Sequence, residues 1–141
     1  MNGQSRVGTT GRPEPVATEL SEPFWTACRE RRLIVQRCTE CGTRFFTPEV
    51  ACTRCASFAW EWVGSDGVGT VYSFTAVHRA ASPGFETPYV VAAVDLDEGW
   101  TIMTHIVGCP VDEVAIGMRV RVEFVEVSPT LTLPCFTPTG S

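Results

Sequence analysis

The sequence predicts a mainly β protein, with an N-terminal helix, a rubredoxin-like four-cysteine zinc ribbon and a five-stranded barrel of the OB type. Four of the seven cysteines form two Cys-x2-Cys pairs separated by ten residues. Five short strand-like segments follow within about 70 residues, with glycines at the turns between them. The 141 residues suffice for one modest core with a small metal-bound unit beside it. A small β-sandwich is the alternative to the barrel.

The first part of the chain predicts a tail followed by a short helix. Residues 1–20 are rich in Gly, Thr, Pro, Ser and Glu without periodicity, so we expect a flexible tail or linker there. A helix start is predicted at Ser21, Glu22 and Pro23: a capping hydroxyl, an acid in the first turn, and a proline where no N–H is needed. The helix is expected to end near Arg32.

The four paired cysteines predict a metal centre. Each Cys-x2-Cys turn directs two thiolates at one point, and soft thiolate ligands favour zinc. An iron site of the rubredoxin type and four unrelated thiols are the alternatives. Four sulfurs leave no coordination position open, so the predicted zinc is structural and folds the ribbon. Phe45 and Phe46 lie between the pairs and are expected to cover the metal. The predicted ligands are Cys38, Cys41, Cys52 and Cys55.

The barrel strands are predicted from short apolar and alternating segments. A turn at 97–99 joins two of them as a hairpin, and its carboxylates Asp95, Asp97 and Glu98 are expected to be solvated. The helix and ribbon are assigned to 21–62 and the barrel to 63–141. The expected strands are 70–78, 89–96, 100–107, 118–127 and 131–136.

Charge and hydropathy exclude several classes of protein. All basic residues are arginines: residues 1–58 hold 8 Arg against 6 Glu, and residues 59–141 hold 3 Arg against 10 acids. Proteins that bind nucleic acid usually present a basic face, so the acidic barrel predicts that this chain does not. No apolar run approaches the roughly 20 residues of a membrane helix, and no signal peptide is visible. We therefore expect a cytoplasmic protein.

No catalytic group is predicted. A cysteine nucleophile needs an activating histidine, and the available ones, His78 and His105, are expected on strands. Cys28, Cys109 and Cys135 are interpreted as packing or surface residues. The chain is therefore predicted to have no enzymatic activity on its own.

The order of helix, ribbon and barrel resembles a known family, the zinc-ribbon/OB-fold proteins associated with acyl-CoA metabolism, long classed as a domain of unknown function. The resemblance leaves out only the N-terminal tail. Any one of its motifs alone is weak, but the set is specific. The matching stretches are 24–25, 33–42, 52–55, Trp62, 69–78, 88–99, 116–118 and 133–136.

The resemblance implies a non-catalytic subunit that binds and stabilises a thiolase-fold enzyme and helps to form its acyl-CoA site. Some members accompany thiolases and hydroxymethylglutaryl-CoA synthase. Others are fused behind a hydratase-like domain and support an aldolase that shortens steroid side chains. A structural zinc, a coenzyme A thioester shared with the partner, and a heterotetramer of two plus two subunits are the corresponding expectations.

Seven residues are candidates for contacts with a ligand or partner. Arginines between residues 29 and 54 suit a phosphate of coenzyme A, with a solvated helix face or ion pairs to an acidic partner as the alternatives. The loop 79–87 is a candidate for guiding an acyl chain or docking the partner. Exposed aromatic side chains are expected to serve as interface anchors. The candidates are Phe24, Trp25, Arg29, Arg32, Arg44, Arg79 and Phe85.

Two other functions remain open from the sequence. A nucleic-acid-binding ribbon and OB module would show salt-dependent retention on heparin. A rubredoxin-like electron carrier would hold iron in the four-cysteine site and would be coloured.

Overall fold

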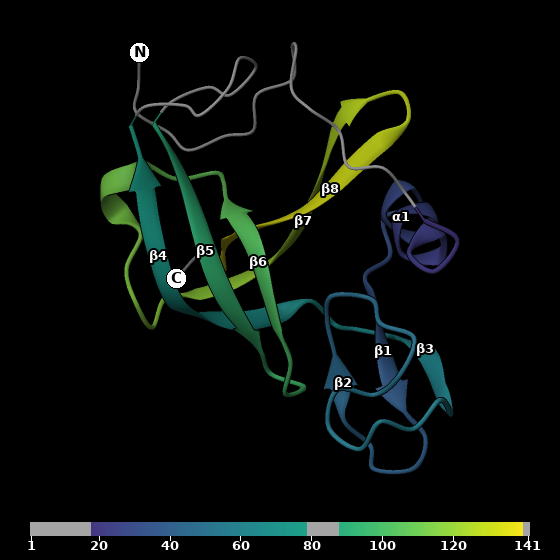
Figure 1. The fold of residues 1–141 in the computed structure, drawn as a ribbon. Helices are drawn as coiled ribbons and strands as arrows, with labels where there is room; N and C mark the ends of the chain where they lie inside the picture. Colours follow the sequence, from purple (N-terminus) through teal and green to yellow (C-terminus); the bar gives the residue numbers. More distant parts are fainter. Residues whose placement is uncertain (1–17, 79–87, 140–141) are drawn as a thin grey trace.

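The computed structural model describes residues 18–78 and 88–139 of the chain. Figure 1 shows helix α1 and a small sheet on one side of the molecule, next to a larger barrel. The small sheet and its loops carry the four paired cysteines. The predicted fold class is therefore confirmed. In the described ranges, no helix is both long enough and apolar enough to span a lipid bilayer.

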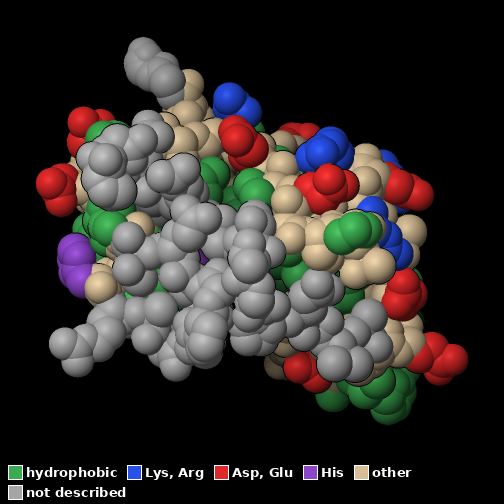
Figure 2. Space-filling view, turned by 90° about the horizontal axis from the view of Figure 1, so that it is seen from above, with side chains coloured by type: hydrophobic (Ala, Val, Ile, Leu, Met, Phe, Trp, Pro, Cys, Tyr) green, Lys and Arg blue, Asp and Glu red, His purple; other side chains and the backbone are tan. Residues whose placement is uncertain are grey.

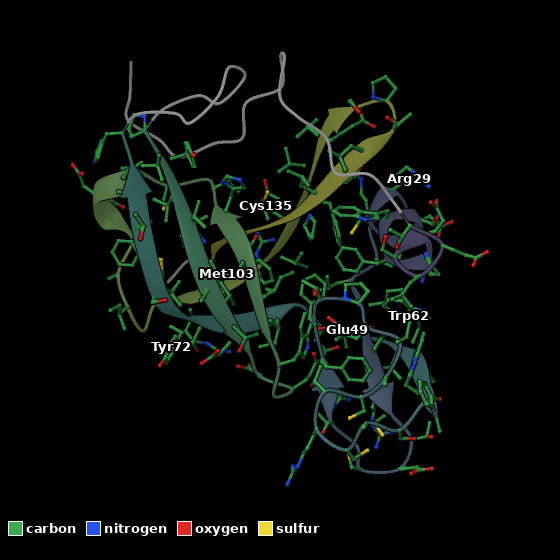
Figure 3. The ribbon with its side chains drawn as sticks, in the orientation of Figure 1. Arg29, Glu49, Trp62, Tyr72, Met103 and Cys135 are labelled. Atoms are coloured by element: carbon green, nitrogen blue, oxygen red, sulfur yellow. The ribbon has the colours of Figure 1, made fainter. Side chains whose placement is uncertain are left out.

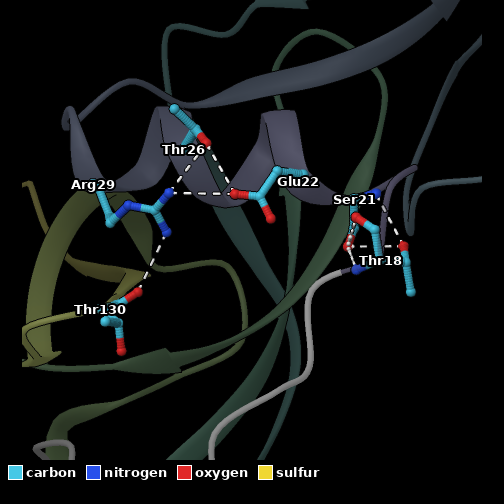
Figure 4. Close-up of polar contacts among 6 residues, drawn as sticks. All are labelled: Thr18, Ser21, Glu22, Thr26, Arg29 and Thr130. Carbon is cyan, nitrogen blue, oxygen red and sulfur yellow. Dashed lines mark hydrogen bonds and ion pairs between the residues drawn. The ribbon is translucent and has the colours of Figure 1, made fainter.

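Helix α1 (Glu22–Arg29) ends earlier than the predicted position near Arg32. Arg31 has a φ of 61°, and a residue in this left-handed region ends an α-helix. The predicted side-chain cap is also wrong. Ser21 occupies the N-cap position without a capping hydrogen bond from its hydroxyl. That hydroxyl instead accepts from the N–H of Thr18 at 2.9 Å (Figure 4).

One face of α1 is buried and its last turn is tied to the barrel. Phe24, Ala27 and Cys28 follow the three- and four-residue spacing of a helix face and are all buried. Cys28 is completely buried in the core, which confirms its expected role as a small packing residue, and this burial raises the pKa of its thiol to about 12. On the exposed side, Arg29 donates to the carbonyl of Thr130 at 3.3 Å (Figure 4).

The ribbon is a three-stranded antiparallel sheet. Its central strand β1 (Ile34–Cys38) pairs with β2 (Arg44–Phe45) on one side and with β3 (Trp60–Gly64) on the other. Gln36 is 1 % exposed; its amide donates to the carbonyl of Glu49 at 2.7 Å and accepts from the N–H of Glu49 at 2.8 Å. These two hydrogen bonds hold the loop between β2 and β3 against β1.

The barrel has five strands in the closed order β4-β5-β6-β8-β7. The neighbouring strands are antiparallel except for β6 and β8, which run parallel. A short 3-10 turn, η1 (Val111–Glu113), precedes β7. The OB-type barrel is thus confirmed over the sandwich. The strands are β4 (Val68–Val77), β5 (Tyr89–Leu96), β6 (Thr101–Ile106), β7 (Arg119–Ser128) and β8 (Leu131–Pro138).

The barrel and the ribbon share one hydrophobic core. Inside the barrel, Ile106 and Phe136 face each other in register across β6 and β8, and both are fully buried. Phe46, from the ribbon, has its ring centroid 5.1 Å from that of Phe24 and 5.6 Å from that of Trp100. The helix, ribbon and barrel are therefore packed into one unit around these aromatic rings.

Candidate functional site: a four-cysteine metal centre and its surroundings

The sulfurs of the four predicted ligands converge on one point. All four Sγ atoms lie within 4.8 Å of one another. Cys38 and Cys55 have a sulfur separation of 3.5 Å, and Cys41 and Cys52 one of 3.6 Å. Sulfurs bound at about 2.3 Å to a tetrahedral zinc lie roughly 3.8 Å apart. The donor set and its spacing thus fit zinc, and they make a closed site.

Backbone amides point at the sulfurs in both turns. The N–H groups of Glu40 and Cys41 donate to the Cys38 sulfur, each at 3.4 Å, and the N–H of Arg54 donates to the Cys52 sulfur at 3.3 Å. Such donors stabilise the negative thiolate that binds a metal. Each Cys-x2-Cys turn therefore supplies both ligands and hydrogen bonds to them.

The two turns have the same backbone geometry. Gly42 and Ala56 follow the second cysteine of their respective pairs, with φ of 78° and 64°. Each donates its N–H to the carbonyl of the first cysteine in its pair, at 3.0 Å for Cys38 and 2.9 Å for Cys52. A left-handed conformation costs a non-glycine residue about 1–2 kcal/mol, so the turn at Ala56 carries strain that the first turn avoids.

The thiols differ in how readily they ionise. Hydrogen bonds from the side chain and backbone of Thr43 lower the pKa of Cys41 to about 6. At Cys55 the backbone of Ser57 favours the thiolate, but the adjacent sulfurs and burial raise the pKa to about 12. Negative charges this close repel one another, so a divalent cation is what allows all four groups to be thiolates. When bound, the ion cross-links the two turns.

Aromatic side chains shield one side of the metal centre. Phe45 is 4 % exposed and packs with Cys38, Cys52 and the half-buried Trp60. This confirms the expectation that Phe45 covers the site. Phe46 does not share this role, because it packs into the core shared with the barrel.

A half-buried carboxylate holds the segment that leads from the ribbon into the barrel, and sequence reasoning missed it. Glu98, in the β5–β6 hairpin, accepts hydrogen bonds from the Ser65 hydroxyl at 2.5 Å and the Asp66 N–H at 2.8 Å. It also accepts from the Trp100 indole at 3.1 Å. Arg44, from β2, donates to the Glu98 carbonyl at 3.5 Å. The expectation of a solvated turn is therefore wrong for Glu98.

Replacing Glu98 by glutamine is expected to destabilise the protein by about 1–2 kcal/mol, because an amide cannot accept all three hydrogen bonds. Burial raises the pKa of Glu98, but the hydrogen bonds from Ser65, Asp66 and Trp100 outweigh it and hold the pKa below its ordinary value. This stabilisation is complete above about pH 5 and is lost as the pH falls through the folded-state pKa. Glu98→Gln should therefore show a smaller loss of stability on acidification than wild type.

The measurement is urea unfolding followed by tryptophan fluorescence, at about pH 7 and about pH 4. Asp95→Asn is the matched control, since Asp95 lies in the same hairpin but is exposed, and we expect little change from it. Equal effects of the two substitutions at neutral pH would mean that the Glu98 carboxylate does not stabilise this segment.

The seven candidate contact residues have different surroundings. Phe24 is only 2 % exposed and packs against the rings of Trp25 and Phe46, each with a centroid separation of 5.1 Å. The expected exposure of Phe24 is therefore wrong, because its helix face turns inward. Trp25 is half-buried. Arg79 and Phe85 lie outside the described residues, so their roles stay predictions.

Most of the clustered arginines contact the chain itself. Figure 2 shows basic and acidic side chains next to each other on the helix side of the molecule. The sequence did not predict these contacts within the chain, and a role of Arg29, Arg32 or Arg44 toward coenzyme A stays a prediction. The contacts are Arg29 with Thr130, Arg31 with the Phe124 carbonyl, Arg32 with Glu30, Arg37 with Glu61, and Arg44 with Glu98.

A groove of about 220 Å³ lies where β6 and β8 diverge. These strands pair in register at Ile106 and Phe136, and the Thr104 hydroxyl donates to the Pro134 carbonyl at 2.8 Å. Trp25 lines this groove, which keeps it a candidate for contact with a ligand or partner.

Of the histidines and the remaining cysteines, His105 and Cys135 share one groove and the others are dispersed. His78 is exposed beyond the end of β4, and Cys109 is a buried loop residue whose pKa is raised by burial and by Glu113. His105 and Cys135 both line the groove between β6 and β8. In the described parts of the chain, the paired cysteines are the one cluster of three or more possible metal ligands.

Two family descriptions match adjacent parts of the chain. Residues 25–61 match the rubredoxin-like zinc ribbon domain of ChsH2, and residues 62–125 match the C-terminal OB-fold domain of ChsH2. The first match covers the metal centre, and the second covers most of the barrel.

Individual relatives match over most of the chain. A probable enoyl-CoA hydratase alpha subunit of Thermomonospora curvata is 44 % identical over 90 % of this chain, which spans 40 % of that relative's length. A DUF35 domain-containing scaffold protein of Methanocaldococcus jannaschii is 38 % identical over 71 % of this chain and 73 % of its own. One chain of a solved structure described as Ltp2-ChsH2(DUF35) aldolase is 40 % identical to this chain, with a TM-score of 0.83. The match covers all of that chain and 90 % of this one.

Proposed function

The chain belongs to the DUF35 family, with the zinc ribbon and OB-fold domains of ChsH2, and from this we propose that it is an accessory subunit of an enzyme acting on acyl-CoA thioesters. The observation that carries the proposal is the full-length match to one chain of a two-protein aldolase. The hydratase alpha subunit and the scaffold protein support the same assignment. The chain spans less than half of the hydratase subunit, so we do not assign the activity of that longer protein to this chain.

More specifically, the proposed role of this chain is that of a non-catalytic subunit. The enzyme it belongs to would be a thiolase-fold aldolase or thiolase that cleaves or forms carbon–carbon bonds. Its partner would supply the nucleophile and base, while this chain stabilises the partner and contributes part of the acyl-CoA site. The closed four-sulfur centre supports this role, because such a metal has no position for substrate. Two copies of each subunit in the complex and steroid side chains as substrates remain predictions from the family resemblance.

The other two candidate functions have less support. A nucleic-acid binder needs cations that are free to contact phosphates, and most arginines clustered near the ribbon contact this chain instead. An electron carrier would use iron in the four-cysteine site, and the match of residues 25–61 is to a zinc ribbon.

Co-expression with a thiolase-fold subunit from the same genome tests the proposal. We expect the two chains to co-elute in size-exclusion chromatography and the catalytic subunit to be more soluble with this chain than without it. Separate elution at micromolar concentrations, with full solubility of the catalytic subunit alone, would contradict the proposal. Metal analysis of the complex distinguishes zinc from iron.

A further inference from the structure

Three adjacent barrel strands are almost free of charge. Among the 10 residues of β4, the 8 of β5 and the 6 of β6, Asp95 is the one Asp, Glu, Lys or Arg. The neighbouring strand β7 has Arg119, Arg121, Glu123 and Glu126 within 10 residues. An antiparallel sheet that faces water normally alternates apolar inward residues with polar outward ones. Strand β7 follows this rule, and the outward side of β4, β5 and β6 departs from it.

The outward side of these strands has small residues at its centre, two large exposed side chains beside them, and polar residues toward its edges. We name as the outer sheet face the residues Tyr72, Thr75, Val91, Ala93, Thr101 and Met103. Two polar residues border it on the same side, because His105 pairs in register with Val91 and Asp95 pairs with Thr101. Tyr72 is 66 % exposed and Met103 is 65 % exposed. Ala93, between them, pairs in register with Ser73 of β4 on one side and with Met103 of β6 on the other. Figure 3 places Tyr72 and Met103 on the barrel, and Met103 also lines the groove that Trp25 and Phe46 border.

The inward side of the same strands explains why the outer sheet face is not needed for folding. Val90, Ala92 and Val94 alternate with the outward residues of β5 and are completely buried in the barrel core. Large exposed apolar side chains therefore remain on the outer sheet face although the core is already filled. Charge-poor surfaces enriched in tyrosine and methionine are typical of the centre of protein–protein interfaces.

We propose that the outer sheet face is the surface on which the catalytic acyl-CoA-processing subunit docks. This rests on the proposed function, since a chain that matches one component of a two-protein aldolase over its full length needs a face for the other component. Nucleic acid is a poor occupant because the three strands provide no arginine or lysine for phosphates. A partner surface that complements this face would be apolar and uncharged, so the association should depend little on salt.

A second exposed apolar site is less suited to this role. Val50 and Phe58, on the ribbon, are 63 % and 78 % exposed. Exposed charged residues, Glu49 and Arg54, lie in the same segment between β2 and β3. This site is also formed by loops, whereas the outer sheet face is formed by paired strands that hold their shape before binding.

Ala93→Arg tests the proposal, because it places a long charged side chain at the centre of the outer sheet face. The matched control is Ala59→Arg, the same substitution at an exposed ribbon residue. Each variant is co-expressed with the thiolase-fold subunit, and binding is measured by size exclusion and calorimetry at low and high salt. We expect Ala93→Arg to weaken binding at least about 30-fold, as loss of a central contact does, and Ala59→Arg to bind like wild type at both salt concentrations.

The possible outcomes distinguish an error in the docking surface from an error in the proposed function. Wild-type binding that Ala93→Arg leaves intact, or that Ala59→Arg weakens equally, overturns the assignment of the outer sheet face. A wild-type dimer that Ala93→Arg converts to a monomer also overturns it, because the face would then bind a second copy. If Ala93→Arg fails to fold, binding is measured with Met103→Arg instead, because that substitution alters an exposed side chain of the same face. Unchanged binding by Met103→Arg would then overturn the assignment. A wild-type chain that binds no catalytic subunit overturns the proposed function itself.

Discussion

Removal of the metal by a strong chelator is expected to unfold residues 33–62 locally while the five barrel strands remain paired. Metal binding contributes roughly 10 kcal/mol or more to the folding of isolated zinc-ribbon-sized units. Strand β2 has two residues and the shared core lies on the barrel side of the ribbon, so the loops that carry the cysteines depend mainly on the metal for their shape. Hydrogen exchange followed by mass spectrometry should show protection lost in β1 to β3 and retained in β4 to β8.

A single ligand substitution tests the same expectation without a chelator. Cys52→Ser should lower the zinc content from one ion per chain to a small fraction and should increase exchange across the ribbon. Cys28→Ala is the matched control, because Cys28 is buried in the helix and lies outside the four-sulfur cluster. It should retain one zinc. Unchanged exchange in the ribbon after verified loss of the metal would contradict the structural role of the ion.

Phe24→Ala is expected to destabilise the protein by about 3–5 kcal/mol, the usual cost of emptying a buried phenylalanine site. Phe24 connects all three parts of the chain: it lies on α1, contacts Phe46 from the ribbon and belongs to the core cluster of the barrel. Chemical unfolding monitored by circular dichroism gives the change in the free energy of unfolding.

The same substitution at an exposed phenylalanine provides the control for Phe24→Ala. Phe58 is 78 % exposed, and Phe58→Ala should change stability by no more than about 0.5 kcal/mol. A change of that small size for Phe24→Ala as well would mean that Phe24 is the exposed anchor that the sequence suggested, and that the shared core is described wrongly.

The metal centre could be predicted because the residues that form it lie close together in the sequence. The turn made by each Cys-x2-Cys pair fixes two ligands within four residues, and the ten-residue spacer brings the pairs together. The barrel strands were predictable for a similar reason, since the alternation of Val120 and Val122 with Arg119 and Arg121 reports a half-buried strand directly. Both features depend on contacts between residues close in sequence or on one periodic face.

The features that sequence reasoning missed depend on contacts between distant residues. Glu98 accepts from Ser65 and Asp66, more than thirty residues away, and no pattern near Glu98 indicates them. Arg31 donates to the Phe124 carbonyl, 93 residues along the chain. Phe24 and Trp25 are adjacent apolar residues on a short helix, so composition alone does not say which of them faces the core. For Phe24 a helical-face analysis with Ala27 and Cys28 was the available signal.

The exposure of the outer sheet face is a consequence of topology that composition only hinted at. The sequence indicates strands at 70–78, 89–96 and 100–107, but their lateral order is what places Tyr72, Ala93 and Met103 on one surface. An accessory subunit of this kind needs two properties, a rigid body and a charge-poor surface. The metal centre and shared core supply the first, and β4 to β6 supply the second.

Steady-state turnover of an acyl-CoA thioester in a carbon–carbon bond cleavage assay tests the accessory role most directly. The assay compares this chain alone, the thiolase-fold subunit alone, and the complex of the two, each with its zinc content verified. The account predicts no turnover by this chain, low turnover by the thiolase-fold subunit alone, and full turnover only by the complex. Turnover by this chain alone, or full turnover by the thiolase-fold subunit without it, would contradict the account.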